Sequence, residues 1–330
     1  MSFEIKNVVA EPSPPLVSFV LFAFNQEEFI ADALAGAFAQ TYSPLQIILS
    51  DDCSSDRTFD IMKECARNYR GPHQIVLNRN EQNLGIGRHI NKLVELAEGE
   101  WIVGAAGDDV SVPTRTDKIM AAATQAGGRA MSIWSRAQHM QADGTLLHIF
   151  EQSSGEAYSA KDIVGNKRVV MGCSHAWHRD VFNVFGPLYH KVMFEDNAIS
   201  FRSFLLGEIV YIDETLVQYR QHDANLTNYV KSLDADLLYA KMFRRRQLAL
   251  VGIHQRMLDV ITYRLHKASD QRLAASLYRM LKTHLFVQSF KTETIHRFRW
   301  LDSFASKLRR GLRGFGNGSA HKAAARHDSN

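Results

Sequence analysis

Three pairs of adjacent acidic residues in this 330-residue chain have types and positions suited to chemistry: Asp51–Asp52, Asp108–Asp109 and Glu195–Asp196. Neighbouring carboxylates repel each other, so a fold keeps such pairs where a ligand or a cation uses their charge. A carboxylate can accept hydrogen bonds from a nucleobase imide or from ribose hydroxyls, and clustered carboxylates can bind Mg²⁺ or Mn²⁺. The pairs therefore suggest a site for a nucleoside diphosphate and a divalent cation.

The elements that must position the first two pairs follow an alternating strand–helix pattern. Continuous apolar runs, typical of strands buried on both faces, alternate with segments of helical spacing. This alternation predicts an α/β fold with a mostly parallel, Rossmann-like sheet flanked by helices. Ligands bind beyond the carboxyl ends of such strands, so Asp51–Asp52, Asp108–Asp109 and Phe24–Asn25 should meet at one edge. The strands are expected at 16–24, 45–50, 73–80 and 100–106, and the helices at 25–41, 55–69 and 88–98.

The second part of the chain has a less regular pattern. A helix is expected after Pro113 and another over 195–206, where Glu195–Asp196 form its first turn. Short strands are expected at 131–140, 146–150, 208–213 and 215–222. The pattern from 231 to 310 is helical, with Ser269 as an expected N-cap. The predicted organisation is a lead-in (1–15), an α/β domain (16–230) with two halves (16–112 and 113–230), a basic helical extension (231–312) and a disordered Gly/Ser-rich tail (313–330).

The charge is distributed unevenly along the chain. Residues 1–230 contain 19 Lys+Arg and 28 Asp+Glu (−9), whereas residues 231–330 contain 20 and 7 (+13), and −9 plus 13 gives the net charge of +4. Basic residues with apolar neighbours, as in SKLRRGLRGF at 306–315, favour an anionic membrane surface as the partner over a solvated helical face. Nucleic acid is not expected, since no recognised module surrounds these residues.

Other features bound the location and the class of site. We identify no secretory signal and no run of about 20 apolar residues, and three cysteines in no disulfide or metal spacing favour a cytoplasmic protein. The sequence has neither G-x-x-x-x-G-K-[ST] nor G-x-G-x-x-G after the first strand, which argues against a P-loop and a dinucleotide fold. The CSHAWH segment at 173–178 fits no standard zinc spacing, although His175 or Trp177 could border an acceptor pocket.

Three segments resemble successive motifs of family 2 glycosyltransferases with the GT-A fold. They are FVLFAFNQEEF…IILSDDCSSDRT (19–58), NLGIGRHIN…GDDVSVPTR (83–115) and FEDNAISF…YRQHDANLT (194–227), and the resemblance spans about 15–228. It implies an inverting glycosyltransferase of the bacterial surface-polysaccharide type. Residues 16–230 would then form a GT-A catalytic domain, with a nucleotide-binding half (16–112) and an acceptor-binding half (113–230). Its donor would be a nucleoside-diphosphate sugar, UDP- or dTDP-linked, and its acceptor a glycan or lipid-linked glycan.

The resemblance assigns the donor-binding residues position by position. Phe22, Phe24, Asn25 and Glu27 would line the nucleotide pocket, with Phe24 covering the base. Asp52 would accept from the base imide while Asp51 supports the turn. Asp108 would contact ribose, and Asp109 would bind Mg²⁺ or Mn²⁺. One departure is Gly107, which occupies the first acidic position of the family's D-x-D element.

The same resemblance makes Asp196 the catalytic base and Glu195 its neighbour in an E-D pair at a helix start. We expect the helix N-terminus to keep Asp196 ionised, ready to take a proton from the acceptor hydroxyl. Arg88 and Arg220 are candidates for the donor diphosphate, and His222 could complete the metal shell.

Several alternatives remain open from the sequence. The acidic pairs could be ordinary caps and turns, because Asp favours such positions. A nucleotidyltransferase would use a similar sheet, but a Gly-rich basic loop should then follow the first strand. A module that only binds a nucleotide sugar would need no base at Asp196. The donor sugar, the acceptor and a homo-oligomer formed through the extension are not fixed by the sequence.

Overall fold

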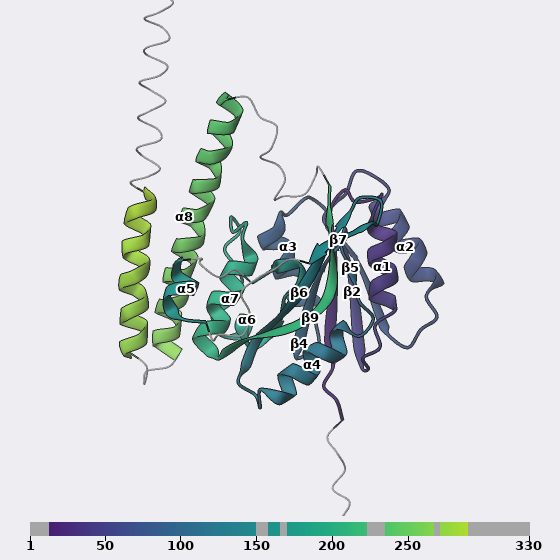
Figure 1. Ribbon diagram of the computed structural model, residues 1–330, viewed down its shortest axis with the longest axis horizontal. Coiled ribbons are helices and arrows are strands. Elements are labelled where there is room, and N and C mark those ends of the chain that lie inside the picture. Colours follow the sequence, from purple (N-terminus) through teal and green to yellow (C-terminus); the bar gives the residue numbers. More distant parts are fainter. Residues whose placement is uncertain (1–12, 150–157, 166–169, 223–234, 267–270, 290–330) are drawn as a thin grey trace, which may run out of the picture.

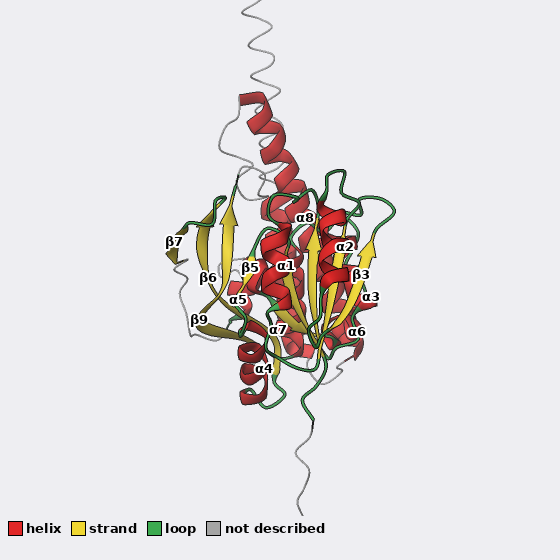
Figure 2. Cartoon of the chain, turned by 90° about the vertical axis from the view of Figure 1, so that its right-hand side faces the viewer, coloured by secondary structure: helices red, strands yellow, loops and turns green. Residues whose placement is uncertain are grey.

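A computed structural model describes residues 13–149, 158–165, 170–222, 235–266 and 271–289, with side chains of 235–248 left out (Figure 1). The expectations for most of the lead-in, for Ser269 and for the tail 313–330 fall outside these ranges. The described residues form one mixed, curled sheet with helices on both of its faces, which confirms the predicted fold class (Figure 2).

The first half of the sheet is parallel and follows the predicted strand–helix alternation. Strands β3, β2, β1 and β4 lie side by side in that order, all parallel. Residues of β1 show why a continuous apolar run forms here. Phe19 belongs to the buried cluster on one face of the sheet, with residues of the helices at 30–38 and 115–125. Val20 belongs to the cluster on the other face, with residues of the helices at 86–96 and 195–206. The elements are β1 (Val17–Ala23), α1 (Ile30–Phe38), β2 (Leu45–Asp51), α2 (Thr58–Asn68), β3 (Gln74–Arg79), α3 (Ile86–Leu96) and β4 (Trp101–Ala106).

The second half continues the sheet in the order β4-β8-β6-β9-β5, with β7 paired to β6. The strands β4 and β8 are antiparallel, as are β8 and β6, whereas β6 and β9 are parallel. The elements are β5 (Val110–Ser111), α4 (Arg115–Gln125), β6 (Ala130–Gln141), β7 (Leu146–Ile149), α5 (Ala160–Gly165), the 3-10 turn η1 (Gly172–Ser174), β8 (Ala176–His178), α6 (Asp180–Phe185), α7 (Glu195–Leu206) and β9 (Glu208–Gln221).

Two predictions for this half need correction. The strands expected at 208–213 and 215–222 form the single strand β9, because the register against β6 moves from Ile212 to Thr215 and leaves Asp213–Glu214 as a bulge. A bulge inserts extra residues without ending the pairing. The strand β8 was not predicted because three residues are too short to show a period.

The C-terminal helices are part of the same folded body. Helix α8 (Ala235–His266) and the helix over 271–289 share a hydrophobic core with α5 and α7, which includes Phe201, Ile253, Val260 and Leu277 (Figure 1). Among the residues that the structure describes, no helix combines the length and apolar composition needed to cross a bilayer.

Candidate functional site

The strand ends bring the first two acidic pairs to one edge of the sheet, as predicted. The Asp52 amide donates to the Ala23 carbonyl across 2.9 Å, and the Gly107 amide donates to the Phe22 carbonyl across 3.0 Å. Both β2 and β4 are thus tied to the end of β1 at the point where each strand ends. We call this region the donor edge.

The carboxylates of Asp51 and Asp52 are held by protein groups at this edge. Asp51 is fully buried, accepts a hydrogen bond from the Ser54 amide at 2.9 Å and lies 3.4 Å from the Arg79 guanidinium. Asp52 fixes the segment 80–85 against the end of β2, because its two oxygens accept from three donors there: Asn80 Nδ2 (2.8 Å), Leu84 N (2.8 Å) and Gly85 N (3.0 Å). Asp51 supports the turn as predicted, whereas contact of Asp52 with a base stays a prediction.

The loop after β1 combines an exposed aromatic ring with two anchoring side chains. Phe24 is 45% exposed, so its ring is available to a base. Asn25 adopts a left-handed backbone conformation (φ 51°), and its backbone N–H donates to the Ser54 hydroxyl at 2.8 Å. Its side-chain oxygen accepts from the Ser55 amide at 2.9 Å. The Glu27 carboxylate accepts from the Arg57 amide at 2.9 Å. Asn25 and Glu27 therefore join the loops that follow β1 and β2.

The second acidic pair is joined to the end of β9. The His222 Nε2 atom lies 3.0 Å from the Asp108 Oδ2 atom, and the Arg220 amide donates to the Asp109 carboxylate at 2.9 Å. Burial and the neighbouring Asp108 raise the pKa of Asp109 well above its ordinary value. Residues 114 positions apart thus meet at the donor edge, as the sequence predicts.

The Arg220 guanidinium is held by protein acceptors. Its side chain is 2% exposed and donates to the Asp108 carbonyl (2.9 Å), the Ala142 carbonyl (2.8 Å) and the Asp32 carboxylate (2.7 Å). These bonds fix the end of β9 against β4 and α1. Arg88, by contrast, is exposed, and its Nε atom donates to the Leu84 carbonyl at 3.2 Å. Diphosphate contacts of Arg88 and Arg220 remain predictions.

The geometry around Gly107 explains why an acidic residue is missing from the first position of the D-x-D element. A Cβ atom at Gly107 would lie 2.7 Å from the Ala23 Cβ atom and 2.5 Å from the Gln26 Oε1 atom. No larger side chain fits there without moving the end of β1. Metal ligands must therefore come from the residues that follow.

The residues at this edge fit a divalent cation that a bound diphosphate would complete. Within the described ranges, no three His, Cys, Asp or Glu side chains are arranged to hold a metal ion by themselves. Asp108 and His222, however, place a carboxylate oxygen and an imidazole nitrogen side by side, and both side chains are partly accessible (13% and 11%). Few protein ligands plus substrate phosphates is a common arrangement for Mg²⁺. Asp109 and His222 are the residues that would hold such an ion, next to the Asp108 carboxylate.

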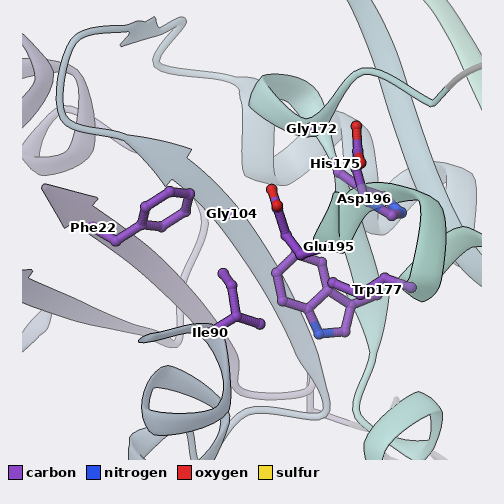
Figure 3. Close-up of a pocket in the computed structure, with 9 residues that line it drawn as sticks. Phe22, Ile90, Gly104, Gly172, His175, Trp177, Glu195 and Asp196 are labelled. Atoms are coloured by element: carbon purple, nitrogen blue, oxygen red, sulfur yellow. The ribbon is translucent and has the colours of Figure 1, made fainter. Parts of the chain in front are cut away.

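The third pair lies in a separate pocket at the start of α7. Both Glu195 and Asp196 line it, and the space not filled by protein atoms is about 240 Å³, of which part is open solvent (Figure 3). Its walls come from β1, α3, β4, η1, β8 and α7. The pocket therefore lies between the end of β1 and the start of α7, the helix that carries the pair. The lining residues are Phe22, Ile90, Gly104, Gly172, His175, Trp177, Glu195, Asp196 and Ile199.

The surroundings make both carboxyls unusually basic. Burial raises the pKa of Asp196 to about 6, although the Asn197 amide donates to its carboxylate at 2.7 Å. Burial and the neighbouring Asp196 raise the pKa of Glu195 to about 8. Desolvation raises the pKa of Asp196 more than the backbone amides of the helix N-terminus lower it. At neutral pH Asp196 is still ionised, while Glu195 is mostly protonated.

His175 and Trp177 lie in the pocket wall, where the sequence allowed them as acceptor neighbours. Burial and the nearby Arg115 lower the pKa of His175 to about 3, so its ring is neutral, and the ring hydrogen-bonds the Ser132 hydroxyl. At Gly104 of β4 a Cβ atom would lie 3.2 Å from the Trp177 ring, so the indole packs where β4 has no side chain.

Arg115 is a residue near the site that the sequence did not single out. It is fully buried and donates to the Gly104 carbonyl (2.7 Å) and the Ser111 hydroxyl (2.9 Å). It thereby braces β4 between the donor edge and the pocket. Its place at the start of α4 gave no signal, because a basic residue in a helical pattern reads as a surface residue.

Known proteins with similar sequences identify the family of this chain. The model of glycosyl transferase family 2 matches residues 18–185. A Haemophilus influenzae protein named as an uncharacterized glycosyltransferase is 23% identical over 310 residues, which cover 82% of this chain and 92% of that protein. TuaG of Bacillus subtilis, named as a candidate glycosyltransferase of teichuronic acid biosynthesis, is 30% identical over 95 residues, or 29% of this chain and 36% of TuaG.

Solved structures share the fold. Staphylococcus aureus TarS (residues 1–349, in complex with UDP-GlcNAc) superposes with a TM-score of 0.51 at 15% identity, covering 77% of this chain and 73% of that one. GalNAc-T7 with UDP, GalNAc and Mn²⁺ gives a TM-score of 0.51 at 16% identity, covering 72% and 52%. The family model matches more than half of the chain. The chain therefore belongs to glycosyl transferase family 2 and is a glycosyltransferase with the GT-A fold.

Proposed function

We propose that the enzyme transfers a sugar from a UDP- or dTDP-sugar to a hydroxyl of a glycan or lipid-linked glycan, with inversion at the anomeric carbon. The observation that carries the proposal is the pocket that Asp196 and Phe22 both line, with Phe22 near the end of β1. The pKa of Asp196 is raised to about 6, so its carboxylate is ionised at neutral pH and can still accept a proton. A base with a pKa near the working pH is the most effective proton acceptor. The relationship to TuaG supports an acceptor from bacterial surface-polysaccharide assembly.

The chemical step follows from these positions. The carboxylate of Asp196 takes the proton of the acceptor hydroxyl while the hydroxyl oxygen forms a bond to the anomeric carbon. The bond from that carbon to the diphosphate oxygen breaks, and the nucleoside diphosphate leaves with the electron pair. Attack opposite the leaving group inverts the configuration, as in inverting glycoside hydrolysis with an alcohol in place of water. The neutral Glu195 can donate a hydrogen bond to the sugar or the acceptor.

The donor edge would hold the rest of the donor. Phe24 would cover the base and Asp52 would accept from its imide. Asp108 would contact ribose, while Arg88 would reach the diphosphate. A divalent ion bound by Asp109 and His222 would stabilise negative charge on the leaving diphosphate. The fold shared with a UDP- and Mn²⁺-bound structure supports this arrangement.

A ligand screen followed by product analysis tests this function. We expect UDP or dTDP with Mn²⁺ to raise the melting temperature more than ADP or GDP does, because a ligand selective for the native state stabilises it. With a sugar donor and an alcohol acceptor, NMR of the product should show the anomeric configuration opposite to that of the donor. Retained configuration would contradict the inverting mechanism, and no stabilisation by any nucleoside diphosphate would contradict the donor class.

We also propose that the C-terminal helices attach the enzyme to an anionic membrane, at the inner face of the cell membrane. On α8, Leu258, Ile261 and Leu265 are 57%, 44% and 83% exposed and lie on one face of the helix. In the described segments 249–266 and 271–289, all exposed Lys, Arg, Asp and Glu side chains are basic: Arg264, Arg272, Arg279 and Lys282. A second copy would face these cations with cations, whereas anionic headgroups complement them.

Vesicle sedimentation tests this attachment. The wild type should pellet with phosphatidylglycerol vesicles, not with phosphatidylcholine vesicles, and salt should weaken the binding. The triple variant Leu258→Ser/Ile261→Ser/Leu265→Ser should lose most of it. The control Leu146→Ser/Ile149→Ser changes exposed apolar residues on β7 (48% and 41%) and should bind like the wild type. Equal pelleting of the triple variant and the wild type would refute the proposed surface.

A further inference from the structure

The segment 186–194 leads from α6 into Glu195–Asp196, and three other helices hold it. Arg202 of α7 donates to the carbonyls of Gly186 (2.7 Å) and Pro187 (3.4 Å). Asn91 of α3 exchanges two hydrogen bonds with the backbone of Leu188, at 2.8 and 2.7 Å. The Tyr189 amide donates to the Gln255 side chain of α8 at 2.8 Å. The approach to the catalytic pair is thus fixed by side chains from outside the pocket.

Asp259 of α8 connects two of these anchors. Its Oδ1 atom lies 3.2 Å from the Arg202 guanidinium, and the two side chains are 2% and 0% exposed. The same oxygen accepts a hydrogen bond from Gln255 Nε2 at 3.0 Å. Asp259 therefore neutralises the arginine that binds residues 186–187 and orients the amide that binds Tyr189. Removing one member of a buried ion pair strands the other charge, so Arg202 depends on Asp259 to keep its place.

We infer that Asp259 is a positioning residue for the catalytic pair: a carboxylate on the C-terminal helix sets, through Arg202 and Gln255, where Glu195–Asp196 begin. This inference rests on the proposed role of Asp196 as base. Proton transfer needs hydrogen-bond reach, and small misplacements of a catalytic group cost large factors in rate. The segment also packs tightly elsewhere, because a Cβ atom on Gly87 would lie 2.6 Å from the Val192 carbonyl oxygen. A shift at 186–189 therefore has few routes other than toward the pair.

The experiment compares Asp259→Asn with a matched buried residue on the same helix. Ile253 is fully buried, has no polar side-chain atom and packs in the hydrophobic core that α8 shares with α5 and α7. We expect Asp259→Asn to lower kcat about 10- to 100-fold while the donor KM changes less than about twofold. Asp259→Glu, which keeps the charge, should recover part of that loss. Ile253→Ala should lower the melting temperature and leave kcat within about threefold of the wild type.

Two further readouts separate positioning from general destabilisation. In Asp259→Asn the acidic limb of the kcat–pH profile should move below 6, since a displaced Asp196 is better hydrated. Gln255→Leu removes the Tyr189 anchor and the hydrogen bond to Asp259 but keeps the Arg202–Asp259 ion pair, so it should lower kcat in the same direction by less. It serves as the test if Asp259→Asn does not fold. Unchanged kcat in Gln255→Leu, or an equal loss in Ile253→Ala, would overturn the inference. The proposed function fails separately, if the wild type transfers no sugar or Asp196→Asn stays active.

Discussion

The donor edge and the pocket lined by Glu195 and Asp196, which we call the base pocket, both contain adjacent carboxylates, but their surroundings differ. At the donor edge, Asp51 and Asp52 accept hydrogen bonds from backbone and side-chain donors or face an arginine. In the base pocket, the Asp196 carboxylate accepts a hydrogen bond from the Asn197 amide, the lining includes the apolar side chains of Trp177 and Ile199, and burial raises the pKa of Asp196 to about 6. Asp51 and Asp52 thus shape the site through donors, whereas Asp196 has the raised pKa that a proton acceptor needs. A raised pKa alone does not define that role, because burial also raises the pKa of Asp109 at the donor edge.

The largest expected effect comes from removing the base. Asp196→Asn keeps the shape of the side chain but cannot accept the acceptor proton, so kcat should fall by about 10²- to 10⁴-fold. Donor affinity should stay within about twofold, because the donor edge is untouched. Kinetics and titration with the nucleoside diphosphate check both. Asp60→Asn, which changes an exposed acid in the first turn of α2, is the control and should behave like the wild type.

A smaller effect, of the opposite kinetic type, is expected at the donor edge. Asp52→Asn weakens the bonds that fix segment 80–85, so the free energy of unfolding should fall by about 1–3 kcal/mol. The donor KM should rise about tenfold while kcat changes little, because the nucleotide pocket loosens and the base does not move. Denaturant unfolding and steady-state kinetics measure the two. If kcat fell and KM stayed constant, the two regions would not have separate roles.

The smallest mutational effect is expected at Phe24. The ring is 45% exposed, and a stacking contact is worth about 0.5–1.5 kcal/mol. Phe24→Ala should therefore raise the donor KM about two- to twelvefold with kcat unchanged. Leu77→Ala, at an exposed apolar residue on β3, is a control for loss of apolar surface. Equal changes in both variants would show that Phe24 makes no specific contact with the base.

Much of the donor edge could be predicted because its signals are local. Continuous apolar runs define the parallel strands, and carboxylates that follow two of them must meet at one edge. The bounds of α7 also match the prediction, since Glu195–Asp196 mark its first turn. The local sequence pattern was sufficient to predict a residue's position wherever a single segment determines that position.

The rest depends on contacts between distant segments. The apolar walls that raise the pKa of Asp196 come from six elements, so the basicity of that group cannot be read from its helix alone. The Arg202–Asp259 pair joins residues 57 positions apart, and both look like ordinary helical surface charges in the sequence. Arg220 was predicted as a diphosphate ligand, yet the fold directs its guanidinium to protein acceptors.

The pH dependence of kcat tests most directly the claim that a half-buried, basic Asp196 performs the reaction. Asp196 must be ionised to accept a proton, and its raised pKa means that it is protonated below about 6. With saturating donor and acceptor, kcat should be level above pH 7 and fall about tenfold per pH unit below 6. A limb near pH 4, typical of a hydrated aspartate, or a flat profile down to pH 5 would contradict the account.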